Sequence, residues 1–212
     1  ELWEAFQDQM RYYAQIHVIM DNFTDRLWEE YMEEPLTSIM GCTLTVLERG
    51  KSIKRGGAKY DFTGNETIGT ANTGNSLYAV KKLVFDDKKL TGEQLKHALL
   101  TNFKDMTTSP TGPQIQQLCL HVPKYGNDVE EVDWMVSRVL ESVCEELPKY
   151  KNTRYGRGPI GGIFQASTTT VSSNTPFGLL TGALPDGREG NVPLSDGQSP
   201  MRGTDTKGPT AA

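Results

Sequence analysis

The first thirty residues carry apolar side chains at every third or fourth position. These positions are Leu2, Phe6, Met10, Tyr13, Ile16, Met20, Phe23 and Leu27. That spacing predicts the apolar stripe of a long amphipathic helix over about residues 1–32. After Pro35, a second apolar pattern predicts a helix over about 36–48, and Gly50 lies just past its end, where a left-handed residue closes a helix easily.

Similar spacing predicts four further helices. Thr91 and Gln94 have the spacing of a capping box, which marks the start of one of them. The clearest helix spans 129–148, because a row of apolar residues shares one of its faces. The other two are a helix over about 75–85, with Leu77, Val80 and Val84 inward, and a short helix around Ile115, Leu118 and Cys119.

The pattern between the helices predicts one or two strands and two long loops. Three threonines and a valine at 168–171 are typical of a β-strand, and the segments 55–75 and 173–212 are rich in glycine and polar residues. Loops longer than about 12–15 residues within a compact domain usually serve function. The pattern therefore indicates an α/β enzyme whose ordered loops line a buried cavity.

Composition limits the kind of protein further. The 212 residues are 36% hydrophobic, which is enough for one sizeable core and one large domain. A net charge of −5 gives no reason to expect nucleic acid or an anionic membrane as a partner, and no apolar run reaches the roughly 20 residues that span a bilayer. Three cysteines suit a reducing cytoplasm. A helical pattern already present at Glu1, and a last stretch without a terminating element, suggest a piece of a longer chain.

Short motifs offer little chemistry. Residues 156–161 spell G-x-G-x-x-G, but they follow a helix and precede a strand, which is the wrong order for a dinucleotide site and indicates a turn. Cys144 lies on the apolar face of the 129–148 helix, so we expect a buried structural thiol there. Cys119 and His121 are two residues apart and point to different helix faces. No spacing of cysteine and histidine suggests a metal site.

Longer strings carry a resemblance. RGGAKYDFTG (55–64), GTANTGNSLYAVKKLVFDDKKLTGEQL (69–95), VPKYGND (122–128), VSSNTPFG (171–178), TGALPDGREG (181–190) and PLSDGQSPMRGTDTKGPTA (193–211) resemble, in the same order, the glycyl radical enzyme family, the pyruvate formate-lyase-like group. The resemblance implies an α/β fold, part of a ten-stranded α/β barrel. Residues 1–212 would form the C-terminal part of the barrel domain, its second half-barrel with outer helices, truncated at both ends.

The family also implies a chemistry. A stored glycyl radical takes hydrogen from a cysteine, and the thiyl radical then takes hydrogen from a small-molecule substrate. A separate activating enzyme, which uses S-adenosylmethionine and an iron–sulfur cluster, installs the radical. Neither the family's cysteine loop nor its radical glycine matches any position here, so no residue of this chain is expected to be catalytic and the chain alone should be inactive. The family implies a homodimer for the full-length protein.

What remains to this chain is a substrate wall. By similarity to dehydratase members, residues 164–172 form a barrel strand, and alternation in it puts Ser167, Thr169 and Val171 on the substrate-binding face and Thr168 and Thr170 on the other. A tyrosine that lines the dehydratase pocket falls at Thr169. The other interpretation of Thr169 is a strand residue with no role in the pocket. The strand itself contains no arginine, which disfavours a sulfonate substrate.

The resulting hypothesis is a radical dehydratase or lyase that cleaves a C–O, C–N or C–C bond in a small polar metabolite of anaerobic metabolism. Two alternatives stay open. One is a formate acetyltransferase, which two adjacent cysteines in the upstream loop would favour over a single Cys-x-Glu. The other is a non-catalytic product of a truncated or split gene, which the reading frame on either side would support or reject.

Overall fold

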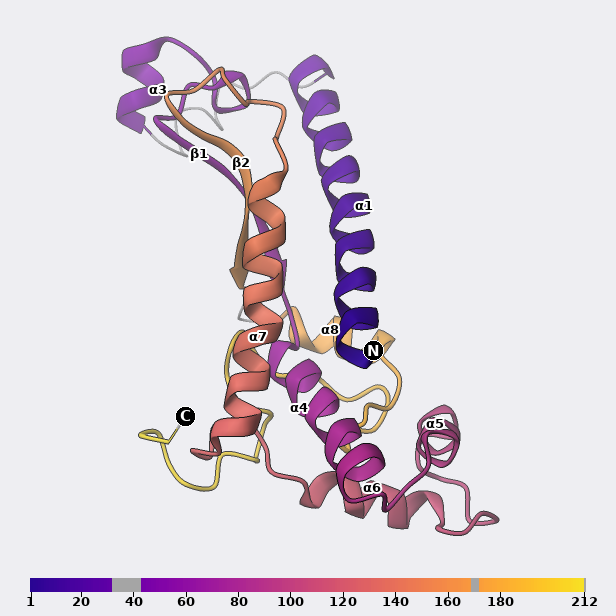
Figure 1. Cartoon of the computed structure of the whole chain (residues 1–212). Coiled ribbons are helices and arrows are strands. Elements are labelled where there is room, and N and C mark those ends of the chain that lie inside the picture. The colour runs from indigo at the N-terminus through magenta and orange to yellow at the C-terminus, as the bar shows by residue number, and fades with distance from the viewer. Residues whose placement is uncertain (32–42, 169–171, 212) are drawn as a thin grey trace. The chain divides into compact units, whose positions relative to one another are not determined.

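The structure is a computed structural model that describes residues 1–31, 43–168 and 172–211. It consists of two compact units (Figure 1). Unit 1 contains Glu1–Asn65 and Ser142–Ser167, and unit 2 contains Glu66–Glu141 and Thr168–Ala212. The first boundary falls within a strand and the second within a helix, so both units share elements of secondary structure.

Unit 1 is built on two strands and one long helix. Its elements are α1 (Leu2–Tyr31), α3 (Thr43–Arg49), a 3-10 turn (Ile53–Arg55), β1 (Tyr60–Thr67), the end of α7 (Glu130–Glu146), a second 3-10 turn (Leu147–Lys149) and β2 (Ile160–Thr168). The long first helix is confirmed. The late strand is present, but it runs over Ile160–Thr168 and so begins four residues earlier than the expected 164–172, of which 169–171 lie outside the described residues. Of the helix expected over 36–48, only the part from Thr43 lies within the described residues, and Gly50 after it is left-handed as expected (φ 58°).

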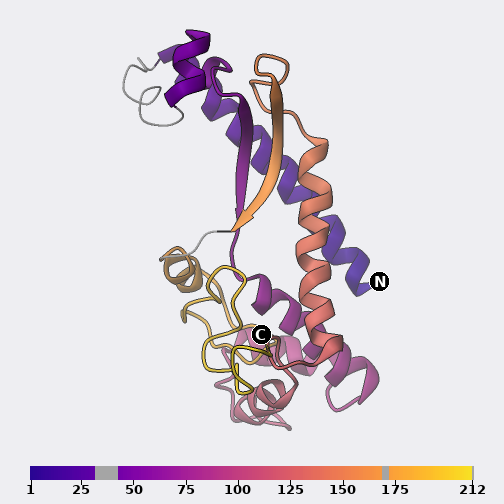
Figure 2. The same ribbon diagram turned by 90° about the vertical axis from the view of Figure 1, so that its left-hand side faces the viewer.

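Strands β1 and β2 lie side by side and run in the same direction (Figure 2). The amide of Ile160 donates to the carbonyl of Lys59 at 3.2 Å, and further along Gly64 lies beside Ser167. Parallel neighbours need a long crossover between them. Here that crossover includes α4 (Thr70–Val80), α5 (Gly92–Leu100), α6 (Gly112–His121) and α7.

One face of the strand pair is covered by helices of unit 1. Phe164 of β2 is fully buried and packs with Val18 of α1 and with Leu147. Four partly buried residues pack against this cluster, namely Ala14, Val143, Tyr150 and Ala166. The β1 residues that alternate onto the buried side are polar, namely Asp61, Thr63 and Asn65. Because this buried face is polar, β1 lacks the apolar alternation by which strands are recognised in a sequence.

Because β1 lacks that pattern, the prediction of one long loop over 55–75 is wrong. The segment contains β1 and the start of α4 (Thr70–Val80), with Gly69 as a left-handed residue between them (φ 73°). α4 therefore begins five residues earlier than the pattern predicts. Tyr78 and Ala79 of α4 and Leu83 just after it belong to the core. Of the three residues expected to point inward, Val80 and Val84 are half-buried against that core, and Leu77 is half-buried.

Much of the apolar stripe predicted for α1 does not pack on its own unit. Tyr13, Met20, Phe23 and Leu27 are exposed and Ile16 is only half-buried, whereas the buried residues of the helix are Val18 and Asp25. An amphipathic stripe normally faces the core. The helix was predicted correctly, but the side by which it contacts the strands is largely polar.

Unit 2 is a group of helices around one apolar core. After α4 the chain makes a π-helical turn (Lys81–Asp86), then α5 (Gly92–Leu100), α6 (Gly112–His121), the first part of α7, and α8 (Asn174–Leu180). The capping box of Thr91 and Gln94 at the start of α5 is confirmed. The core is formed by Tyr78, Ala79, Leu83, Leu90, Leu95, Ala98, Phe103, Ile115, Cys119, Val122 and Val132.

Two further expectations are corrected here. The segment from Ser173 onward does not remain a loop, because α8 forms over Asn174–Leu180 with Pro176 in its first turn, where a proline is tolerated. Cys144 is exposed rather than buried. At the end of α7 the buried positions are Ser142 and Glu146, so the buried face has moved away from Cys144. Across the described ranges, every helix is too short or too polar to cross a bilayer.

Candidate functional site

The strand face opposite the helices carries the predicted site. Gly64 of β1 and Ser167 of β2 are neighbours on it, since a Cβ placed on Gly64 would lie 3.5 Å from the Cβ of Ser167. On the same face the large side chains of Tyr60 and Phe62 are exposed, as is Gln165. Two small residues side by side near the end of a strand leave room for a ligand between larger neighbours.

Ser167 lies where the alternation predicts. It is half-buried and follows Gln165 on the face away from Phe164, and Thr168 is exposed on the other face. Thr169 and Val171, the other two predicted pocket residues, and Thr170 lie outside the described residues. In parallel α/β folds, ligands bind at the carboxyl ends of strands, and Ser167 is the last residue but one of β2.

A buried ionic cluster fixes the strand pair from behind. The Nε atom of Arg154 donates to both carboxylate oxygens of Asp61 at 2.8 Å, its Nη1 donates to Asp25 of α1, and its Nη2 donates to Thr63 at 3.1 Å. Lys54 also donates to Asp25. The cluster ties α1, β1 and the approach to β2 together, and sequence motifs gave no signal for it.

The carboxylate of Asp25 and the guanidinium of Arg154 stay charged in this cluster. Burial alone would raise the pKa of Asp25, but hydrogen bonds from Lys54 and Arg154 lower it below its ordinary value. Burial alone would lower the pKa of Arg154, but its bonds to Asp61 and Asp25 raise it. Removing one member would leave the others buried without compensation, which is costly.

A second polar centre lies within unit 2, in the turn P-D-G-R at 185–188. Asp186 is fully buried, accepts from the side-chain amide of Asn72 at 2.6 Å, and accepts from the backbone amide of Arg188 at 2.9 Å. Burial raises the pKa of Asp186. The other side of the Asn72 amide accepts from the backbone of Ser195 at 2.6 Å. Asn72 thus joins α4 to two separate parts of the C-terminal segment.

Arg188 organises the chain around α8. Its guanidinium donates to the carbonyls of Gly178 at 2.6 Å and Gly182 at 2.8 Å, and to that of Val192. Burial lowers the pKa of this guanidinium. Carbonyls at the end of a helix attract a cation, so the side chain caps α8 and closes the loop that follows. The only sequence signal was the turn itself.

Lys124 plays a similar part at the end of α6. Its ammonium is buried and donates to the carbonyls of Cys119 at 2.7 Å and Val122 at 2.6 Å. Burial lowers the pKa of Lys124 to about 8 and raises that of the Cys119 thiol to about 11. Cys119 is therefore an unreactive core residue. The Nδ1 atom of His121, two residues later, donates to the carbonyl of Gln117 at 2.6 Å.

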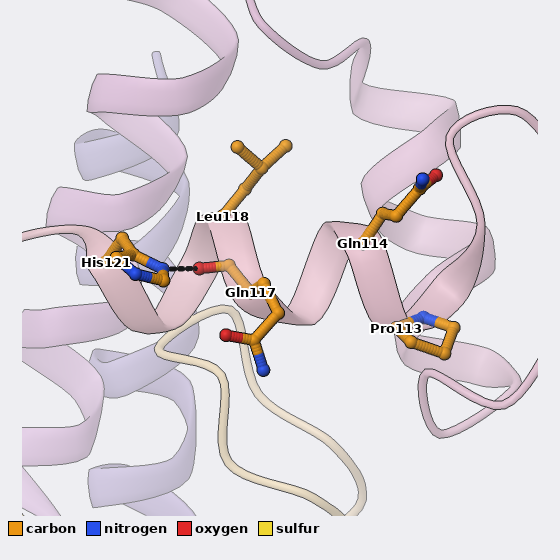
Figure 3. A pocket seen from close by; sticks show the side chains of 5 residues that line it. All are labelled: Pro113, Gln114, Gln117, Leu118 and His121. Carbon is orange, nitrogen blue, oxygen red and sulfur yellow. Dashed lines mark hydrogen bonds between the residues drawn. The ribbon is translucent and has the colours of Figure 1, made fainter.

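The surface along α6 offers few polar groups that could bind a ligand. A shallow hollow of about 610 Å³ lies along α6 and is lined almost entirely by apolar surface of Pro113, Gln114, Gln117, Leu118 and His121 (Figure 3). No charged partner faces it among these residues. Within residues 1–31, 43–168 and 172–211, no group of three or more His, Cys, Asp or Glu side chains is arranged to hold a metal ion.

Comparisons with known proteins identify the family of this chain. A model of the family described as "Pyruvate formate lyase-like" matches residues 1–178. The "Probable dehydratase YbiW" of Escherichia coli K12 is 43% identical over 212 residues, which are 100% of this chain and 25% of that protein. The chain spans about a quarter of the length of the curated relatives it matches.

Solved structures give the same result. One that concerns 1,2-propanediol dehydration in Roseburia inulinivorans superimposes with a TM-score of 0.88 at 38% identity, over 99% of this chain and 26% of that one. A glycyl radical enzyme from Archaeoglobus fulgidus gives 0.85 at 33% identity, over 99% and 25%. The fold is thus that of part of the α/β barrel found in glycyl radical enzymes. The chain belongs to the pyruvate formate lyase-like family, as the sequence led us to expect.

Proposed function

We propose that the full-length protein is a glycyl radical dehydratase that acts on a small polar metabolite, with a vicinal diol as the first substrate to test. The observation that carries this proposal is the similarity of the whole chain to the structure concerned with 1,2-propanediol dehydration. The relation to a probable dehydratase supports it independently. The overall reaction would convert the diol into an aldehyde and water.

In this proposal the chain supplies part of the substrate wall. Ser167, Thr169 and Val171 would line it, and Gly64 would leave space beside Ser167. Short hydroxyl side chains on this face can hydrogen-bond the hydroxyl groups of a diol. No arginine lies on β2, and the two buried guanidinium groups, of Arg154 and Arg188, already bind protein groups. A sulfonate or another strong anion would therefore find no clamp on this strand.

The radical chemistry would be supplied by a glycine and a cysteine in other parts of the same barrel domain. The described cysteines do not fit that role, since Cys119 lies buried in α6 and Cys144 is on α7, neither on the strand pair. A partner enzyme that uses S-adenosylmethionine and an iron–sulfur cluster would install the radical. We place the full-length protein, as a homodimer, in the cytoplasm.

The test uses the full-length protein, activated without oxygen by its activating enzyme, S-adenosylmethionine and a reductant. We expect a glycyl radical doublet in the EPR spectrum and loss of 1,2-propanediol with formation of an aldehyde. A radical signal without turnover of diols, but with formate produced from pyruvate and coenzyme A, would favour the acetyltransferase instead. Absence of the doublet under conditions that activate a known relative would contradict the radical class itself.

A further inference from the structure

α1 has two faces with opposite character. The side toward the strands uses mainly polar contacts: Asp25 binds Arg154, Asn22 donates to the carbonyl of Lys151, and Asp21 accepts from Asn65. The opposite side carries an outer stripe, defined as Tyr13, Ile19, Met20, Phe23, Leu27 and Tyr31. These six side chains are 39% to 73% exposed. The hydrophobic side of this helix therefore points away from its own unit.

The outer stripe is continuous. At 100° per residue, its six positions fall within an arc of about 120°, and from first to last they cover about 27 Å of helix. The buried residues Val18 and Asp25 lie on the opposite side of the same helix. Scattered apolar side chains are normal on a surface, but an aligned set of this size marks an interaction site.

The barrel fold makes this stripe unusual. A helix that coats a barrel rests one face on the sheet and turns the other to water, so its outer face should be polar. A helix that is apolar away from the sheet needs a further layer on top of it. The straight, narrow form of the stripe suits one or two helices packed along its length.

We propose that, in the full-length protein, the outer stripe is covered by another segment of the same polypeptide, from outside these 212 residues. The relatives align with all 212 residues but are about four times as long, so such a protein has ample chain for this layer. A second copy fits less well. Six side chains on one helix are few compared with the about 20–30 residues that each partner commits to a stable interface.

Photo-crosslinking of the full-length protein tests this assignment. p-Benzoylphenylalanine in place of Phe23 probes the middle of the stripe. The same group in place of His17, which is exposed on the same helix about 100° away from the centre of the stripe, is the matched control. After irradiation we expect the Phe23 probe to react several-fold more than the His17 probe. The product should keep the mass of one polypeptide and join α1 to a peptide outside residues 1–212.

Other products would overturn the proposal. A product of twice the mass would assign the stripe to a second copy, and a cross-link within residues 1–212 would assign it to this chain. Equal yields from both probes would mean that the stripe faces water. Ile19→Cys gives an independent measurement: its labelling by a maleimide should be at least tenfold slower in the folded protein than in denaturant, and dilution should not change that ratio. This test needs no enzymatic activity, so it stands or falls separately from the proposed function.

Discussion

The two described cysteines occupy opposite environments, although both lie on helices with apolar neighbours. Cys119 is fully buried, and burial raises its pKa to about 11, whereas Cys144 is exposed. The thiolate is the reactive form, so Cys119 is disfavoured both by access and by protonation.

Alkylation of the native full-length protein at pH 8 should therefore modify Cys144 readily and Cys119 at least about a thousandfold more slowly. Mass spectrometry of the separate peptides measures both rates in one sample. In denaturant the two rates should become similar. Equal labelling in the native protein would mean that the core of unit 2 opens on the timescale of the reaction.

Lys124 should make the stability of the protein depend on pH above neutrality. Its pKa falls from 10.5 to about 8 on folding, so the folded state disfavours its charged form. That penalty is present in full below pH 8 and is relieved as the pH rises toward 10.5. Relative to Lys124→Met, which does not titrate, the wild type should gain up to about 3 kcal/mol between these pH values.

Urea unfolding of the full-length wild type and of Lys124→Met at pH 7, 9 and 10.5 gives this difference directly. Other groups that titrate in the range are common to both proteins and cancel. A difference that stays constant with pH would show that Lys124 has an ordinary pKa in the folded protein.

Helix α7 packs closely against α4 at Gly74. A Cβ at this position would lie 2.3 Å from a methyl carbon of Val136 and 2.8 Å from its Cα. Gly74→Ala should therefore destabilise the protein by about 1–3 kcal/mol, because neither backbone can retreat without disturbing the core.

Gly92→Ala is the matched control, since nothing lies within 4 Å of a Cβ at the start of α5. It should leave the free energy of unfolding unchanged or raise it by up to about 1 kcal/mol. Thermal or urea unfolding of both variants provides the measurement. Equal effects of the two substitutions would contradict the close packing of α4 on α7.

The two faces of β2 give a prediction about substrate binding. Ser167→Leu should raise the KM for a diol about tenfold or more, because the larger side chain fills the space beside Gly64 and removes a hydroxyl. Thr168→Leu, one residue later and on the other face, should change KM by less than about twofold. Steady-state kinetics of the activated full-length variants compares them. A larger effect from Thr168→Leu would reverse the assignment of the faces.

Sequence and structure agree best where a signal is local. The period of α1 and the capping box at Thr91 depend on neighbours in the chain, and both were predicted correctly. β1 was missed because its buried residues are polar and are compensated by Arg154, which lies about 90 positions away. For the same reason the exposure of Cys144 and the outward stripe of α1 could not be predicted, since both depend on what each helix face meets in space.

We do not expect the 212-residue chain to carry a glycyl radical by itself. Neither described cysteine lies on the strand pair, and by resemblance to the family we expect the radical glycine to lie in another part of the full-length protein. The 212-residue chain incubated with the activating enzyme should therefore give no glycyl EPR doublet, while the full-length protein under the same conditions should. A doublet from the chain alone would place the radical on one of its own glycines.

The pairing of β1 with β2 also has a consequence for synthesis of the protein. About 100 residues separate the two strands, so at about 5–20 residues per second a ribosome releases β1 roughly 5–20 s before its partner exists. During that interval the edges of β1 are open to other chains. Asp61, Thr63 and Asn65 make the waiting strand a poor template for aggregation, because amyloid-prone segments are apolar and uncharged. The polar face that later binds Arg154 thus also protects the nascent chain.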